Sequence, residues 1–188
     1  DPATGELTKP DSILLSESQA EQLVKELESG AWTVSNIEEK PRTSRPRPPF
    51  TTSTLQQEAA RKLRLSARRT MRLAQQLYEN GFITYMRTDS THLSAEAIVG
   101  ARQVIANLFG DDYLPGKANR YKTKVKNAQE AHEAIRPAHR QFRTVEDVKS
   151  TLGEDAAKLY DLIWKRTVAC QMPPAKLKQT TVMIQTQK

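Results

Sequence analysis

Residues 40–49 constrain this chain more than any other stretch, because they hold four prolines and three arginines. Proline lacks a backbone N–H and disfavours the helical region for the residue before it, so such a run favours extended backbone over a packed element. We expect a connector here, with a domain boundary between residues 48 and 49. A proline pair at residues 173–174 marks a second boundary.

The rest of the sequence predicts mostly helices. Apolar side chains recur at helical spacing after a serine or threonine that can cap a helix, in two places with an acid or amide three residues later. The predicted starts are Ser18 (with Glu21), Ser53 (with Gln56), Ser66, Ser94 and Thr144, and a longer helix ends near Cys170. Strands are predicted over residues 31–37, 83–90 and 176–187.

This layout places strands near both ends of the chain and helices in the middle. With 188 residues, 37% of them apolar, the chain can bury one moderate core or two small ones. We therefore expect a mixed α/β, predominantly α-helical fold. In it, a helical domain (49–172) is inserted between short β-rich segments contributed by both chain ends (1–48 and 173–188).

The charge of the chain suits a polyanion. Its net charge is +7, and two basic runs contain no acid. They comprise Arg61, Lys62, Arg64, Arg68, Arg69 and Arg72, and then Lys117, Arg120, Lys122, Lys124 and Lys126. On a helix, Arg68, Arg72 and Gln75 would share one polar face that can reach phosphates. A solvated surface would show the same pattern, so nucleic acid is one of two interpretations.

Composition also limits the setting. No segment approaches the ~18 consecutive apolar residues of a membrane span, so we expect no membrane association. Cys170 is the only cysteine and cannot form an internal disulfide, which indicates a reducing, intracellular setting, and we expect a cytoplasmic location. Cys170 lies on an apolar helix stripe and is expected to be buried.

The segment 83–90 carries the most suggestive chemistry. Tyr85, Arg87 and Asp89 alternate, so in an extended segment their side chains would share one face. A phenol titrates near ~10 and becomes a good nucleophile when its oxyanion is stabilised. A guanidinium can stabilise that oxyanion and also bind a phosphate oxygen. A surface ion pair beside a half-buried ring would have the same spacing.

Other chemistries fit the residues less well. Five residues separate Gly110 from Gly116 where a phosphate loop needs four, and Ala118 stands where a magnesium-binding Ser or Thr should be, so we expect no ATP site. No acidic cluster suggests a metal site in this segment. His132 lies among charged neighbours and is a candidate for phosphate binding or proton transfer. Tyrosine recombinases also combine Arg, His and Tyr, but their tyrosine follows the histidine, whereas Tyr85 precedes His132.

Three segments resemble, in the family's order, the core motifs of the type IA DNA topoisomerases. They are residues 49–59 (PFTTSTLQQEA), 81–90 (GFITYMRTDS) and 129–137 (QEAHEAIRP). The resemblance continues more loosely to residue 176. The methionine at position 86 resembles bacterial topoisomerase I within this family, since topoisomerase III typically has a proline at that position.

This resemblance implies a role for several side chains. Tyr85 would attack a single DNA strand to form a transient 5′-phosphotyrosine, which allows strand passage and relaxation of negative supercoils without ATP. Arg87 would lie by the scissile phosphate, and Asp89 would orient its neighbours. The DNA-binding residues implied are His132 and Gln75, with Thr84 and Arg136 as further candidates beside Arg68 and Arg72.

The resemblance also implies that the chain is a piece of a four-domain ring. It would contain most of the tyrosine domain and part of the β-rich gate domain, while the acidic domain that binds Mg²⁺ is absent. We therefore expect no cofactor in this segment, Mg²⁺ in the full-length enzyme, and no activity of the piece alone. The expected partners are single-stranded and negatively supercoiled DNA and the remainder of the same polypeptide, in a monomer associated with the bacterial chromosome.

Two other interpretations remain open. The basic runs and the short helix pair also suit a non-catalytic DNA-binding module. A structural interaction domain would have no measurable affinity for nucleic acid even at low salt.

Overall fold

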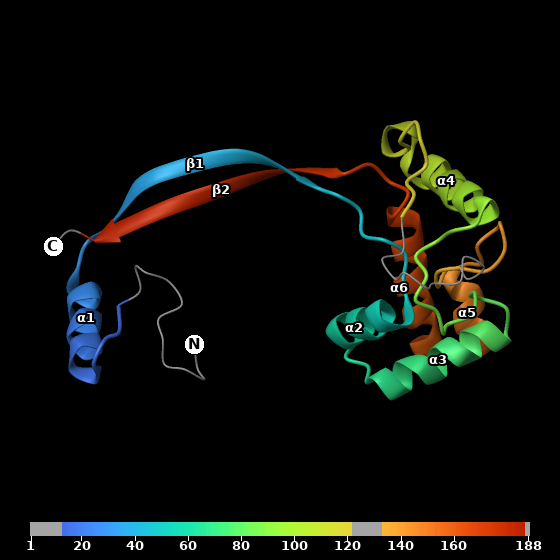
Figure 1. Cartoon of the computed structure of the whole chain (residues 1–188), viewed down its shortest axis with the longest axis horizontal. Coiled ribbons are helices and arrows are strands. Elements are labelled where there is room, and N and C mark those ends of the chain that lie inside the picture. Colours follow the sequence, from blue (N-terminus) through green and yellow to red (C-terminus); the bar gives the residue numbers. More distant parts are fainter. Residues whose placement is uncertain (1–12, 122–132, 187–188) are drawn as a thin grey trace. The chain divides into compact units, whose positions relative to one another are not determined.

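The structure is a computed structural model that describes residues 13–121 and 133–186 (Figure 1). Contacts divide the chain into two units. The strand unit combines the N-terminal part, up to Arg42, with the C-terminal part from Lys176 onward, and the helical unit is Thr43–Ala175. The chain therefore leaves the strand unit once and returns to it once.

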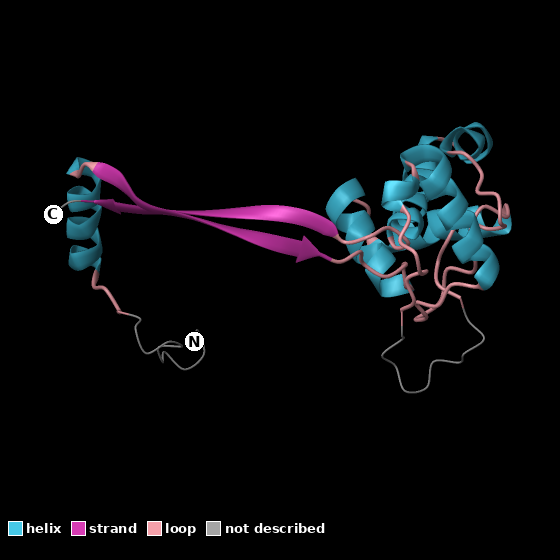
Figure 2. Ribbon diagram, turned by 90° about the horizontal axis from the view of Figure 1, so that it is seen from above, coloured by secondary structure: helices cyan, strands magenta, loops and turns pink. Residues whose placement is uncertain are grey.

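The part of the strand unit that the structure describes contains one helix and a two-stranded sheet. Helix α1 is Glu17–Ser29, and strands β1 (Trp32–Ser44) and β2 (Ala175–Thr186) pair with each other. The strands run in opposite directions (Figure 2). The predicted fold class is confirmed, since both chain ends contribute the β structure and helices fill the middle.

Two details of this unit differ from the prediction. Helix α1 is capped by Ser16, which exchanges hydrogen bonds with Gln19, and not by Ser18. Overlapping serines offer the same spacing twice, and the earlier one adds residues to the helix. Strand β1 runs through Pro41 to Ser44, so only residues 45–49 form the connector. In a two-stranded ribbon each strand has a free edge, where proline is tolerated.

The helical unit contains five α-helices and a short 3₁₀ helix among its described residues. They are α2 (Thr52–Leu63), α3 (Ala67–Glu79), α4 (Ala95–Phe109), η1 (Asp111–Tyr113), α5 (Val145–Leu152) and α6 (Glu154–Ala169). The predicted caps Ser66, Ser94 and Thr144 are confirmed. The predicted cap Ser53 is wrong, because Thr51 caps α2 in a reciprocal pair with Thr54. No helix in the described ranges has the length and apolarity that crossing a bilayer requires.

The core of the helical unit forms around α6. Tyr160 and Ile163 of this helix are fully buried, together with Leu55 of α2 and Leu77 of α3. The Tyr160 hydroxyl is satisfied by donating to the carbonyl of Arg143 at 2.8 Å. Phe50, Ile83, Met86 and Ile135 are buried in the same core, so it also holds the three segments that resemble topoisomerase motifs.

A smaller cluster forms at the end of α6. Cys170 packs there with Leu93 and Ala134, and burial raises the pKa of its thiol to about 12. The expectation that Cys170 is buried is therefore confirmed. The hydroxyl of Tyr121 lies 2.8 Å from the carbonyl oxygen of Cys170 and 3.3 Å from that of Pro46. Tyr121 thus ties the outgoing connector to the end of α6.

Candidate active site

The segment around Tyr85 is irregular, so the predicted strand over residues 83–90 is wrong. Its regular pairing is limited to one isolated antiparallel bridge between Ile83 and Pro137, next to which the Thr84 N–H donates to the Arg136 carbonyl at 2.9 Å. Beyond this bridge, the backbone groups bind a threonine instead of a neighbouring strand.

That threonine is Thr52, at the start of α2. Its hydroxyl donates to the Met86 carbonyl at 2.8 Å and accepts from the Thr88 N–H at 2.9 Å. Its own N–H donates to the Thr88 carbonyl at 2.9 Å. Thr52 therefore fixes the backbone on both sides of Arg87 without a strand, and the first motif holds the second.

Exposed and buried side chains still alternate along this segment, although it is not a strand. Met86 and Ser90 are buried, while Tyr85, Arg87 and Asp89 are exposed. Arg87 and Asp89 line an open hollow together with Thr52, Ser53 and Thr88. Within the described residues no ion pair joins Arg87 to Asp89.

The third motif closes onto the other two. Ile135 donates its N–H to the Phe50 carbonyl at 2.8 Å, and Ala138 donates to the Phe82 carbonyl at 2.8 Å. The Thr84 hydroxyl donates to the Ala134 carbonyl at 2.7 Å. The three motifs, far apart in sequence, therefore form one hydrogen-bonded unit beneath Tyr85, and the Thr84 hydroxyl serves this unit rather than an open surface. His132 lies outside the described residues.

Arg136 is buried in an ion pair. Only 6% of the residue is exposed, and its guanidinium donates to Glu133 at 2.7 Å and to the Pro137 carbonyl at 2.8 Å. Burial alone would raise the pKa of Glu133, but hydrogen bonds from Arg136 and Ser94 hold it below its ordinary value. This geometry does not favour the predicted DNA contact of Arg136, because its guanidinium holds the third motif to the start of α4.

The predicted polar face of α3 is present. Arg68, Arg72 and Gln75 are all exposed, and the Gln75 amide donates to Glu79 at 2.6 Å. This face belongs to the same helix that leads, through the turn at Gly81, into the Tyr85 segment. The structure therefore connects the basic helix directly to the candidate nucleophile.

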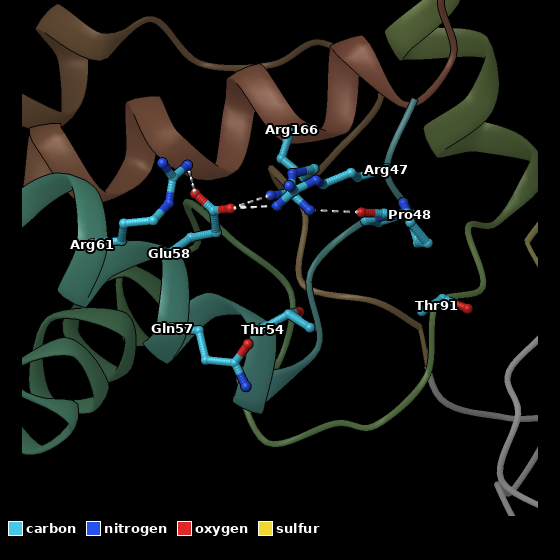
Figure 3. A pocket seen from close by; sticks show the side chains of 9 residues that line it. Arg47, Pro48, Thr54, Gln57, Glu58, Arg61, Thr91 and Arg166 are labelled. Atoms are coloured by element: carbon cyan, nitrogen blue, oxygen red, sulfur yellow. Dashed lines mark hydrogen bonds and ion pairs between the residues drawn. The ribbon is translucent and has the colours of Figure 1, made fainter. Parts of the chain in front are cut away.

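Sequence reasoning missed an ion cluster centred on Glu58 (Figure 3). This α2 carboxylate, 8% exposed, accepts from Arg61 at 2.9 Å and from Arg47 of the connector at 2.8 Å, and lies 3.3 Å from Arg166 of α6. The Arg166 guanidinium stacks 4.2 Å over the Phe50 ring and donates to the Pro48 carbonyl at 3.3 Å. The cluster anchors the connector to two helices. No sequence signal identifies it, because Arg166 is distant in the chain.

The cluster leads to a prediction about stability. Burial would raise the pKa of Glu58, but the Arg61 hydrogen bond and the charges of Arg61, Arg166 and Lys62 hold it below its ordinary value of 4.5. Glu58→Gln is expected to lower the free energy of unfolding by about 2 kcal/mol at pH 7, less than for a fully buried pair because Arg47 and Arg61 are largely exposed.

The sign of the pH dependence follows from the lowered pKa. The contribution of Glu58 is complete above its unfolded pKa and is lost as the pH falls through the folded value. Urea unfolding should therefore show a constant difference between the two proteins from pH 7 to pH 5, above the ordinary value of 4.5, and a difference that shrinks as the pH falls further. Glu96→Gln, at an exposed site, is the control and should shift stability by less than about 0.5 kcal/mol. A difference that stays constant below pH 4.5 as well would contradict this account.

Comparison with known proteins decides the family. The family model described as DNA topoisomerase matches residues 4–188, nearly the whole chain. The chain belongs to the type IA DNA topoisomerase family. DNA topoisomerase 1 of Synechocystis sp. is 53% identical over 98% of this chain, and that of Mycolicibacterium smegmatis is 54% identical over 92%.

A solved structure agrees with the sequence relatives. Full-length topoisomerase I from Thermotoga maritima matches 96% of this chain with a TM-score of 0.70 and 37% identity. The chain spans 20% of the Synechocystis protein, 18% of the Mycolicibacterium protein and 29% of the Thermotoga chain. The topoisomerase segment described here is thus similar to about a fifth of each curated relative.

Proposed function

We propose that this chain is the cleavage and gate segment of a longer bacterial type IA topoisomerase, with Tyr85 as its nucleophile. The observation that carries the proposal is the joining of the three motifs, through Thr52 and the backbone of Phe50 and Ile135, into one support for an exposed tyrosine. The relatives named DNA topoisomerase 1 supply the reaction class.

The proposed step is a transesterification. The Tyr85 phenol oxygen attacks a phosphorus of a single DNA strand while its proton passes to a base or to water. The bond from phosphorus to the 3′ oxygen breaks, and that oxygen takes up a proton. One phosphodiester replaces another, so religation by the 3′-hydroxyl needs no ATP. Passage of a strand through the break then relaxes negative supercoils.

The neighbouring residues would act on the phosphate and the strand. Arg87 lies one buried residue beyond Tyr85 and lines an open hollow, so its planar guanidinium can hold two phosphate oxygens as negative charge builds up. Asp89 borders the same hollow and would orient Arg87. Arg68, Arg72 and Gln75 would track the backbone of the strand along α3, and His132 would complete the DNA pocket.

The rest of the enzyme would lie elsewhere in the polypeptide. In the described residues no three His, Cys, Asp or Glu side chains lie close enough to hold a metal ion. Following the resemblance to the family, we propose that Mg²⁺ binds to the remainder of the polypeptide, and we expect the 188-residue chain alone not to relax DNA. The proposed whole acts as a monomer in the cytoplasm, on the bacterial chromosome.

The test is to trap and map the adduct. The longer protein is incubated with single-stranded DNA in Mg²⁺, denatured and digested, and the peptide carrying nucleotides is sequenced by mass spectrometry. The nucleotides should be attached to Tyr85. A label at the 3′ end of the DNA should remain with the protein, and a label at the 5′ end should not. Attachment to another residue, or retention of the 5′ label, would refute the assignment.

A non-catalytic DNA-binding module remains the second candidate, because the exposed basic face of α3 requires no chemistry. That candidate predicts DNA binding with no covalent adduct under any condition. The same trapping experiment therefore separates the two.

A further inference from the structure

In the described residues, the ring of Tyr85 has one aromatic neighbour, which the proposed mechanism does not use. Tyr78, at the end of α3, meets Tyr85 edge to face, with ring centroids 5.2 Å apart and ring planes at 68°. Both side chains are half exposed, 41% for Tyr78 and 45% for Tyr85. Half-exposed rings are not needed to fill the core, so this contact calls for another explanation.

The backbone on both sides of the pair is fixed. The Gly81 N–H donates to the Tyr78 carbonyl at 2.9 Å, and the Phe82 N–H donates to the Leu77 carbonyl at 2.8 Å. Gly81 has a φ of +72°, a conformation that L side chains rarely adopt, and this lets the chain turn sharply between the two tyrosines. The backbone therefore holds Tyr78 at a fixed position beside Tyr85, where the two rings meet.

Little else restrains the Tyr85 side chain. Among residues 13–121 and 133–186 its hydroxyl has no hydrogen-bond partner, and its ring is open to solvent on one side. An exposed ring on a fixed backbone still samples several side-chain rotamers. An edge-to-face aromatic contact favours one of them, because the ring edge of one partner is attracted to the face of the other.

We propose that Tyr78 is a positioning residue for the nucleophile, holding the Tyr85 ring in the orientation from which its oxygen attacks DNA. This inference rests on the proposed function of Tyr85. The effect operates through the ring of Tyr78 and not through its hydroxyl, so phenylalanine can replace it and an aliphatic side chain cannot. It also operates before the bond forms, since a phosphotyrosine linkage holds the ring by itself.

The experiment measures single-turnover cleavage and religation by the longer protein at saturating single-stranded DNA, with DNA affinity measured separately. Tyr78→Leu is expected to slow cleavage about fivefold, with unchanged affinity and an unchanged religation rate. Tyr78→Phe should restore cleavage to within about twofold of the parent. Tyr113→Leu is the matched control, because Tyr113 is 52% exposed and also has an aromatic neighbour, Phe109, at 6.1 Å.

Each other outcome overturns the inference. Normal cleavage by Tyr78→Leu would show that the contact has no role in positioning. Weaker DNA binding with an unchanged saturating rate would make Tyr78 a stacking platform for a base. Equal losses in the Tyr113 control would indicate a general effect of losing a surface ring. An adduct that forms without the Tyr85 hydroxyl would instead refute the proposed function, and this result is distinguishable from the other three.

Discussion

Tyr85→Phe in the longer protein is expected to abolish the covalent DNA adduct, with a loss of at least about 1000-fold in cleavage. The substitution removes only the oxygen that would bond to phosphorus. The ring, its contact with Tyr78 and the backbone bonds of the segment all remain. The measurement is adduct formation on a labelled single strand in Mg²⁺, resolved after denaturation.

The structure makes this substitution easy to interpret. The Tyr85 hydroxyl has no hydrogen-bond partner in the described parts of the chain, so its removal leaves no buried polar group unpaired. The melting temperature and DNA affinity should match those of the parent. Tyr113→Phe removes a hydroxyl from another exposed tyrosine and should leave cleavage unchanged. Undiminished adduct from Tyr85→Phe would remove Tyr85 from its role.

Arg87→Lys should give the second largest effect, a loss of about 100-fold in cleavage, similar to the removal of one donor from an oxyanion site. Lysine keeps the positive charge but loses the planar fork that can hold two phosphate oxygens together. Because Thr52 fixes the backbone on both sides of Arg87, the loss is not explained by a moved segment.

Binding and cleavage must be measured separately for this variant. Affinity for single-stranded DNA is best determined in a Tyr85→Phe background, where no adduct forms, and should change less than about threefold, since the charge is kept. Arg45→Lys replaces an exposed arginine of the connector and is the control. If affinity and cleavage fell in proportion, Arg87 would only bind the phosphate and would not specifically stabilise the transition state.

Local sequence rules predicted much of the fold. The caps Ser66, Ser94 and Thr144 follow from residue types at short spacing, and the pairing of the two chain ends follows from the order of predicted strands and helices along the chain. Overlapping patterns were ambiguous, which is why the predicted caps of α1 and α2 fell two residues late. The Tyr85 segment has the composition of a strand, and only the tertiary partner Thr52 explains why it is not one.

In the candidate site, too, some features could be predicted from the sequence and others depend on tertiary contacts. The motifs and the exposed alternation of Tyr85, Arg87 and Asp89 could be predicted from sequence. The burial of Arg136 could not, because an arginine three residues after Glu133 has the same spacing in a buried ion pair as on an open surface. The Tyr78 contact could not be predicted either, because the spacing of the two tyrosines does not show how the turn at Gly81 brings their rings together.

The tie between Tyr121, Pro46 and Cys170 bears on the order of folding. Strands β1 and β2 are separated by about 130 residues, and bringing the ends of so long a free loop together costs on the order of 4 kcal/mol in chain entropy. Once the helical unit has folded, the Tyr121 hydroxyl lies against the backbone at both crossings, 3.3 Å from Pro46 and 2.8 Å from Cys170. The chain segments before β2 and after β1 are then already held together. Pairing of β1 with β2 can start from that point, and it costs about as much chain entropy as closing a hairpin.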